Sequence, residues 1–242
     1  MEDTAGPSQV SVIGRFRVRI AVISDVHSNL QALEEVKRRT DDEGIDYVLS
    51  AGDAVGYGAN PNRCCAILSG WARNSVLGNH DVAALRRDPS GMNPYAAKAA
   101  LWTAERIDEH SREYLESLKE SAHSKPDGRA VEVRHGSLRS ILEYVFEADL
   151  SEDLLMQSGA EVLVLGHTHV PYARRYASGL IVNPGSVGQP RDGDPRASFG
   201  ILQTDPLSFE ISRVDYDIDG ASEAILNAGL PEFLAERLFR GF

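Results

Sequence analysis

Apolar, β-branched runs alternate with amphipathic stretches over the first two thirds of the chain. The pattern predicts a strand at about 17–24, then a helix that begins after a capping residue, Ser28 or Asn29, and ends at Gly44. The next apolar run predicts a strand at 46–50. Such a β-α-β unit places its two strands parallel with a right-handed crossover.

A second unit of this kind follows, with a short helix at about 61–69 and a strand at 74–77. The stretch 94–120 has apolar positions at helical spacing and predicts a longer helical region. This region can either cap a site formed by the preceding loops or pack on a sheet face, and we favour packing for most of its length.

The later part of the chain changes from alternating helices and strands to shorter β runs. A strand, a helix and a strand are predicted at 129–135, 151–158 and 162–166. Further strands are expected at 173–177, 179–183, 197–203 and 208–215, and one or two helices at 219–239. The alternation of apolar and polar residues over 209–214 is typical of an antiparallel strand with one solvent-exposed face. We expect a tail at 1–14 and a single domain at 15–242.

Composition narrows the class of protein. A hydrophobic fraction of 42% is enough for a packed core, and no apolar stretch reaches the ~20 residues that cross a bilayer. The N-terminus lacks the apolar segment of a secretory signal, and the adjacent Cys64 and Cys65 cannot staple distant segments. We therefore expect a cytoplasmic protein. The net charge of −11 argues against an extended nucleic-acid or membrane surface, but it permits a small phosphorylated substrate.

Five separated clusters of metal-type ligands follow these apolar runs, and they contain five of the seven histidines. The clusters are Asp25-Val26-His27, Gly52-Asp53, Gly78-Asn79-His80-Asp81, His135-Gly136 and Gly166-His167-Thr168-His169. Because binding groups gather at the carboxyl ends of strands in open α/β folds, we expect the clusters to meet at one sheet edge. That arrangement predicts a metal-dependent hydrolase.

The ligand types suit a pair of transition-metal ions. Asp25 and His27 lie two residues apart, and on an extended strand end both side chains point to the same side. Asp53 has two carboxylate oxygens and can bridge two ions. The remaining candidate ligands are one amide and three imidazoles: Asn79, His135, His167 and His169. This mixed nitrogen and oxygen set favours Mn, Fe, Zn, Ni or Co over Ca or Mg.

His80 has a different expected role. Because it directly follows Asn79, only one of the two side chains is expected to point at the metals. A histidine beside a metal pair can protonate a leaving oxygen, and Asp81 can hold its imidazole by a hydrogen bond. By contrast, His110 and His123 lie in polar surroundings and are interpreted as surface residues. The Cys64-Cys65 pair is interpreted as core packing.

The ordered set Asp-x-His, Gly-Asp, Gly-Asn-His-Asp, His-Gly and Gly-His-x-His, over residues 25–169, resembles the calcineurin-like metallophosphoesterase superfamily. The resemblance implies a four-layer α/β/β/α sandwich of two mixed sheets and a binuclear metal centre. It assigns one ion to Asp25, His27, Asp53 and His169, and the other to Asp53, Asn79, His135 and His167. It further implies that a metal-bridging hydroxide attacks phosphorus while His80, positioned by Asp81, assists catalysis.

One departure concerns the substrate. In the serine/threonine protein phosphatases and diadenosine tetraphosphatases, the Gly-Asp block continues into Asp-Arg-Gly, whose Arg grips phosphate. Here the chain continues from Gly52-Asp53 into Ala54-Val55-Gly56-Tyr57-Gly58 without an Arg. This resembles the smaller bacterial and archaeal phosphodiesterase-like members. Loss of one cationic contact weakens the binding of a monoester dianion more than that of a diester.

We therefore expect phosphodiester or nucleotide substrates. The alternatives are a phosphomonoesterase or serine/threonine protein phosphatase, and a non-catalytic interaction subunit on the same fold. A late loop at 183–192 also resembles a segment of the smaller members. Either Arg191 or Ser186 contacts substrate there, or the Gly and Pro residues simply shape a turn.

Overall fold

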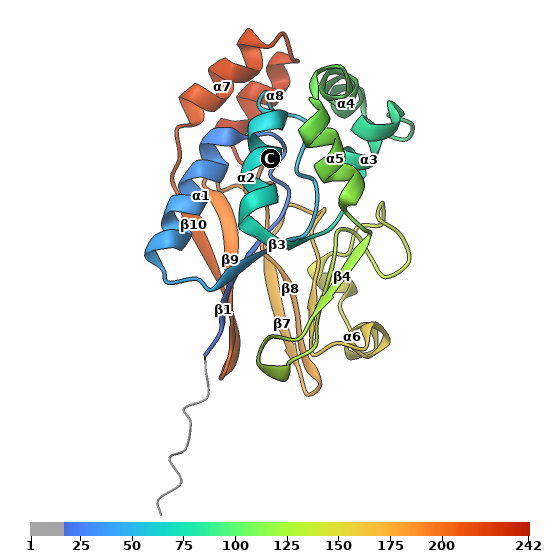
Figure 1. Ribbon diagram of the computed structural model, residues 1–242, viewed down its shortest axis with the longest axis vertical. Coiled ribbons are helices and arrows are strands. Elements are labelled where there is room, and N and C mark those ends of the chain that lie inside the picture. The colour runs from blue at the N-terminus through green and yellow to red at the C-terminus, as the bar shows by residue number, and fades with distance from the viewer. Residues whose placement is uncertain (1–16) are drawn as a thin grey trace, which may run out of the picture.

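Two five-stranded mixed sheets form the centre of the molecule, in a computed structural model that describes residues 17–242 (Figure 1). The predicted tail at 1–14 lies outside the described residues. In the first sheet the strand order is β10-β9-β1-β2-β3, with bounds β1 Arg19–Ile23, β2 Tyr47–Ser50, β3 Ala72–Ser75, β9 Ala197–Thr204 and β10 Leu207–Val214. β1, β2 and β3 are parallel, as the two β-α-β units predict, and β9 joins β1 antiparallel.

The second sheet has the order β4-β5-β6-β8-β7. Its strands are β4 Ser121–Ser124, β5 Val131–Arg134, β6 Val162–Val164, β7 Tyr172–Tyr176 and β8 Gly179–Asn183. β5, β6 and β8 are parallel, and the edge strands β4 and β7 run antiparallel to their neighbours. Each sheet therefore contains three adjacent parallel strands, which are central in the second sheet and run out to the edge strand β3 in the first.

Eight α-helices are described, and seven of them lie on the side of the first sheet (Figure 1). They are α1 Leu30–Asp42, α2 Pro61–Trp71, α3 Asn79–Arg86, α4 Pro94–Arg106, α5 Glu109–Ser117, α7 Ile218–Asn227 and α8 Glu232–Glu236. α6, Glu152–Ser158, packs on the second sheet instead. No helix of residues 17–242 is long and apolar enough to cross a membrane.

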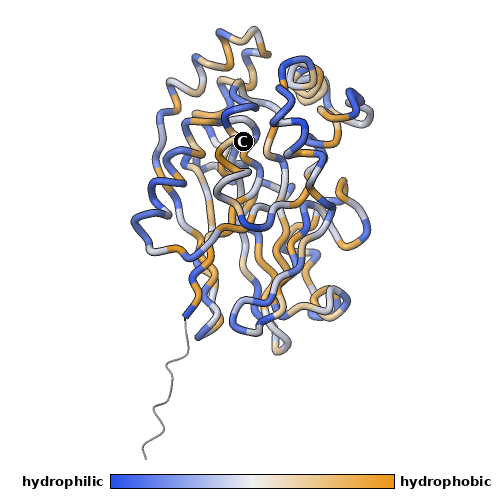
Figure 2. Tube along the Cα trace, in the orientation of Figure 1, coloured by the Kyte–Doolittle hydropathy of each residue, from blue (hydrophilic) through white to orange (hydrophobic). Residues whose placement is uncertain are grey.

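Three buried clusters separate these layers. Ile20 and Val22 of β1 face the second sheet, whereas Ala21 and Ile23 face the helices. Because β1 is buried on both faces, its sequence is a continuous apolar run rather than an alternating one. A third cluster packs Leu155 of α6 against the outer face of the second sheet. Figure 2 shows the apolar residues concentrated along the strands. The predicted four-layer α/β/β/α sandwich is confirmed.

The structure differs from the predicted elements at several places. The helical region at 94–120 is two helices, because Asp108 leaves the helical conformation and caps α5 by accepting from Ser111 N at 2.8 Å. α3, which was not predicted, begins at Asn79, and β3 ends two residues earlier than predicted. α4 buries a face of alanines, but it packs against α2 and α3 rather than directly on a sheet face.

Candidate metal centre

The five predicted clusters meet at the carboxyl ends of the parallel strands of both sheets. All seven predicted ligands are buried: Asp25, His27, Asp53, Asn79, His135, His167 and His169. Their donor atoms form overlapping groups, Asp25/His27/His169, His27/Asp53/His80 and Asp53/His135/His167, with the atoms of each group within 4.8 Å of one another. The other two histidines, His110 and His123, are exposed, as predicted.

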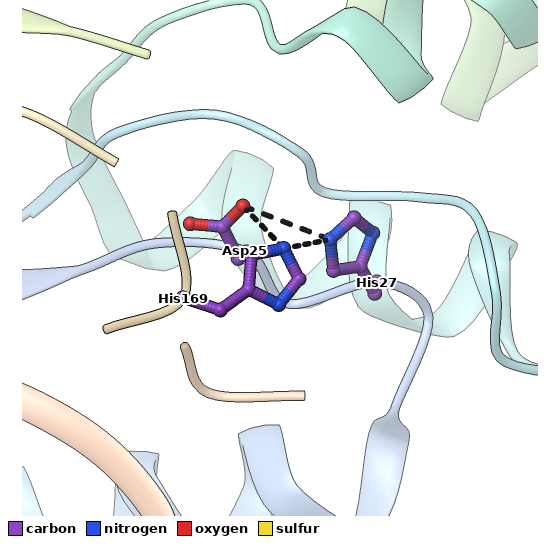
Figure 3. Close-up of side chains that lie close together, drawn as sticks. All are labelled: Asp25, His27 and His169. Carbon is purple, nitrogen blue, oxygen red and sulfur yellow. Dashed lines mark hydrogen bonds and ion pairs between the residues drawn. The ribbon is translucent and has the colours of Figure 1, made fainter. Parts of the chain in front are cut away.

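The first group consists of one carboxylate and two imidazoles that point at one another (Figure 3). Asp25 Oδ1 lies 3.1 Å from His169 Nε2 and 3.6 Å from His27 Nε2, and the two nitrogens are 3.1 Å apart. Asp25 Oδ1 is buried and has no hydrogen-bond partner. A buried carboxylate oxygen without a partner is costly, and a cation among these three atoms would satisfy it.

Asp53 lies between this group and a second one. Its Oδ2 atom is 3.6 Å from His27 Nε2 and 3.3 Å from His135 Nε2, and it too is buried without a hydrogen-bond partner. His135 Nε2 lies 3.0 Å from Asn79 Oδ1 and 3.1 Å from His167 Nδ1. The residues therefore fit two neighbouring metal positions, with Asp53 as the group that both can share.

Backbone carbonyl groups fix the tautomer of each ligand imidazole. The Nδ1 atoms of His27, His135 and His169 lie 3.1, 2.8 and 2.5 Å from the carbonyl oxygens of Val55, Ala51 and Gln189, respectively. His167 is turned the other way, with Nε2 3.3 Å from Leu142 O. An N–H that donates to a carbonyl leaves the other ring nitrogen with its lone pair toward the centre, as a metal ligand requires.

The backbone of the ligand loops is left-handed. Asp25, His27, Asp53, His167 and His169 have φ values of 54°, 49°, 54°, 67° and 59°. Positive φ is uncommon outside glycine, and its clustering at one place is typical of functional sites. The geometric reason given above for Asp25 and His27 is therefore wrong. β1 ends at Ile23, and the loop conformation rather than an extended strand brings the two side chains together.

The charges of the centre are strongly coupled. Burial raises the pKa of Asp25 and Asp53, but the facing His169 and His135 outweigh it and hold both pKa values below the ordinary range. Burial lowers the pKa of His169 to about 3 and that of His167 to about 4. Burial also opposes the charge of His135, but the Asp53 carboxylate prevails and raises its pKa to about 9. The Asp53 carboxylate thus favours a positive charge beside it, either a proton on His135 or a bound cation.

His80 lies beside the ligands and is held by packing. Its ring contacts the rings of Tyr57 and His27, with centroids 4.4 and 4.8 Å apart. A Cβ atom on Gly56 would come within 2.5 Å of His80 Nδ1, so the glycine leaves the space that the imidazole fills. The nitrogen Nδ1 has no hydrogen-bond partner.

The predicted hydrogen bond between Asp81 and the His80 imidazole is wrong. Asp81 accepts instead from Gly78 N at 2.9 Å and from Val55 N at 3.0 Å. It is the third residue of α3, where a carboxylate can reach back to the orphan amides at the helix start. Asp81 therefore fixes the loop that surrounds the His80 ring rather than the ring itself.

Two features of the site were missed from the sequence. Tyr57 packs against His27 and His80, and the unusual Gly-Tyr-Gly after Gly52-Asp53 was its only signal. Gln189 supplies the carbonyl for His169. Ser186, considered above as a substrate contact, is fully buried and donates to Asp25 O at 2.8 Å. Its hydroxyl supports the ligand loop and is not open to substrate.

A groove of about 570 Å³ opens beside the second group. Asn79, His80 and His167 line its inner end. Its walls come from the start of α4, from α3 and from the loop 141–144, and they include Arg86, Met92, Ala96, Leu142 and Tyr144. The Tyr144 ring stacks on His167 with centroids 4.0 Å apart. A substrate can thus reach His80 and the second group from this side.

Comparisons with known proteins agree with this geometry. A model of the calcineurin-like phosphoesterase superfamily domain matches residues 18–206. The chain therefore belongs to the calcineurin-like phosphoesterase superfamily, as its motifs predict.

Its relatives include small bacterial and archaeal proteins. It is 38% identical over 240 residues to the uncharacterized protein MJ0912 of Methanocaldococcus jannaschii, covering 92% of this chain and 98% of that one. It is 27% identical over 200 residues to phosphodiesterase YfcE of Escherichia coli K12, covering 79% and 90%. A metallophosphoesterase structure from Sphaerobacter thermophilus superposes with a TM-score of 0.83 at 37% identity, covering 94% and 100%.

Replacing Asp53 by Asn tests its position between the two groups. We expect Asp53→Asn to bind less than about one divalent ion per chain after loading, because it removes the negative oxygen that both groups can share. Elemental analysis after gel filtration measures this. Asp153→Asn, an exposed residue of α6, is the matched control and should load like the wild type. Full metal content in Asp53→Asn would contradict a shared ligand.

The raised pKa of His135 predicts a pH dependence of metal binding. The metal needs the unprotonated imidazole, so between pH 7 and pH 9 binding displaces one proton from this residue. The apparent affinity should then rise by about tenfold per pH unit and level off above pH 9. Calorimetry with Mn²⁺ in buffers of different ionisation enthalpy counts the released proton. An affinity that is constant from pH 7 to 9, with no proton release, would refute this account.

Proposed function

We propose that the chain is a metal-dependent phosphodiesterase whose centre holds two divalent transition-metal ions. The observation that carries this proposal is the pair of unpartnered carboxylate oxygens, Asp25 Oδ1 and Asp53 Oδ2, both buried among imidazole nitrogens. No donor within residues 17–242 satisfies either oxygen, and cations bound among these atoms would satisfy both. Within a family of phosphoesterases, such a centre is best suited to the hydrolysis of a phosphoric ester.

The residues fall into two ligand sets. One position has Asp25, His27, Asp53 and His169, and the other has Asp53, Asn79, His135 and His167. The mixed nitrogen and oxygen donors favour Mn, Fe, Zn, Ni or Co. Divalent ions bound there supply Lewis-acid polarisation of the phosphoryl group and activation of a water nucleophile. Asp53 holds the two positions in register, and the carbonyl-bound imidazoles keep their lone pairs directed inward.

His80 is the proposed proton donor to the leaving oxygen. Burial lowers the pKa of His80 and so favours its neutral form in the free site. To protonate the leaving oxygen, the imidazole must first take up a proton, which the negative charge of a bound phosphoryl ester favours. Its Nδ1 atom faces Gly56 without a hydrogen-bond partner, which favours the tautomer with the proton on Nε2. The residue also lines the groove, where the departing alcohol would leave. Asp81, through Gly78 and Val55, keeps the surrounding loop in place.

Two observations favour diesters over monoesters. The groove has room for an organic substituent next to His80. YfcE of Escherichia coli, which shares 27% of its residues with the chain over 200 positions, is named a phosphodiesterase. The alternatives are a phosphomonoesterase or serine/threonine protein phosphatase, and a non-catalytic interaction subunit. The intact ligand set and the buried His80 argue against the last of these.

The free, buried thiols of Cys64 and Cys65 fit a reducing cytoplasm.

Metal reconstitution tests the proposal directly. Protein stripped with a chelator and reloaded with Mn²⁺ should bind about two ions per chain and hydrolyse bis(4-nitrophenyl) phosphate. A second chelation should abolish the release of nitrophenol, and fresh Mn²⁺ should restore it. Faster hydrolysis of 4-nitrophenyl phosphate than of the diester would support the monoesterase instead. Inactivity with both esters across Mn, Fe, Zn, Ni and Co would support the non-catalytic subunit.

Replacing His80 by Asn separates proton donation from metal binding. His80→Asn should lower kcat for the diester by about 10²- to 10⁴-fold, the usual contribution of a general acid, while metal content stays at the wild-type level. His123→Asn, at an exposed position of β4, is the matched control. His80 shares one ligand group with His27 and Asp53. Loss of metal in His80→Asn would therefore show that His80 is a ligand and would overturn its role as proton donor.

A further inference from the structure

Arg191 carries a positive charge at the edge of the centre that no carboxylate neutralises among residues 17–242. Its Nη2 atom donates to two neutral oxygens, Gln189 Oε1 at 3.1 Å and Tyr57 Oη at 3.3 Å. Its Nε atom is buried and has no hydrogen-bond partner. By contrast, Arg213 and Arg196 form ion pairs with Asp192 and Asp194. A buried donor without a partner is unfavourable, and an anionic oxygen beside the Arg191 guanidinium would satisfy it.

The loop that carries Arg191 is fixed to the metal ligands. Arg191 N donates to His169 O at 3.2 Å, and the preceding loop accepts from His169 Nδ1 through Gln189 O. The guanidinium lies 5.8 Å from the centroid of the Tyr57 ring, which itself packs against His27 and His80. The cation is thus one aromatic ring away from two of the imidazoles of the centre.

A second cation lies on the same ring. Arg237, in the short 3-10 turn after α8, places its guanidinium carbon 5.9 Å from the Tyr57 centroid. Its Nε donates to the main-chain oxygen of Phe242. Burial, together with the nearby Arg191, lowers the pKa of Arg237 to about 10. Two guanidinium groups on one ring repel each other, and an anion near both would turn this repulsion into attraction.

We propose that Arg191, with Arg237 behind it, forms a subsite for a non-bridging phosphoryl oxygen of the substrate ester. The subsite would supply the cationic contact that is missing after Asp53, from a loop more than a hundred residues later in the chain. A guanidinium suits this role because its planar donors match phosphoryl oxygens. This inference rests on the proposed function, and it predicts that a monoester dianion depends on Arg191 more than a diester does.

Kinetics of Arg191→Gln on Mn²⁺-loaded protein test the subsite. We expect KM for bis(4-nitrophenyl) phosphate to rise by roughly 10- to 100-fold, the loss typical of a hydrogen bond to a charged group, with a larger rise for 4-nitrophenyl phosphate. Metal content should not change. Arg191→Lys keeps the charge without the planar donors, and its KM for each ester should fall between those of the wild type and Arg191→Gln. The matched control is Arg174→Gln, because Arg174 is an exposed arginine of β7 that pairs with Glu147.

Binding of inorganic phosphate, measured by calorimetry on the Mn²⁺-loaded proteins, separates this inference from the proposed function. If the wild type hydrolyses no ester but binds phosphate at least tenfold more tightly than Arg191→Gln, the subsite stands and the proposed function fails. If phosphate affinity and KM are the same in both proteins, the subsite is refuted. Loss of metal from Arg191→Gln and Arg191→Lys alike would also refute it, since Arg191 would then act only by holding the His169 loop.

Discussion

The burial of two carboxylates whose inward oxygens have no hydrogen-bond partner is the constraint on which the rest of this structure depends. Asp25 Oδ1 and Asp53 Oδ2 are removed from water and surrounded by imidazole nitrogens. Such an arrangement is unfavourable unless positive charge is brought to it. In the metal-free protein the proton on His135 supplies part of that charge, and its pKa is raised to about 9 by Asp53. A divalent cation bound among these atoms would supply far more.

Rigid surroundings maintain this unfavourable cluster. The loops after β1 and β2 are hydrogen-bonded to each other, with His27 N donating to Asp53 O at 3.0 Å. The loop at 183–191 contacts the loop after β1, because Ser186 donates to the carbonyl oxygen of Asp25. These contacts stabilise the left-handed backbone at the ligands, which isolated loops would not adopt. The two packed sheets hold the loops because their parallel strands all end at the same side of the sandwich.

The cationic edge of the centre comes from other parts of the chain than the candidate metal ligands. The candidate metal ligands come from segments between Asp25 and His169, whereas Arg191 lies in the loop after β8 and Arg237 follows α8, and both contact the ring of Tyr57. The chain as a whole is acidic, with a net charge of −11, yet two guanidinium groups lie at this edge of the site. The positions of these two guanidinium groups, rather than the net charge of the chain, would therefore govern the binding of an anionic ester.

The sequence by itself determined the family, the four-layer fold and the acidic, amide and imidazole side chains that meet at the centre, because each of these residues follows an apolar strand run. The sequence did not reveal why Asp25 and His27 meet, since their loop conformation depends on hydrogen bonds to residues 53–54. It also misjudged Asp81, whose carboxylate is captured by the amides of Gly78 and Val55. Only the tertiary structure decided these points and the position of Arg191, because contacts between distant segments leave no local periodicity.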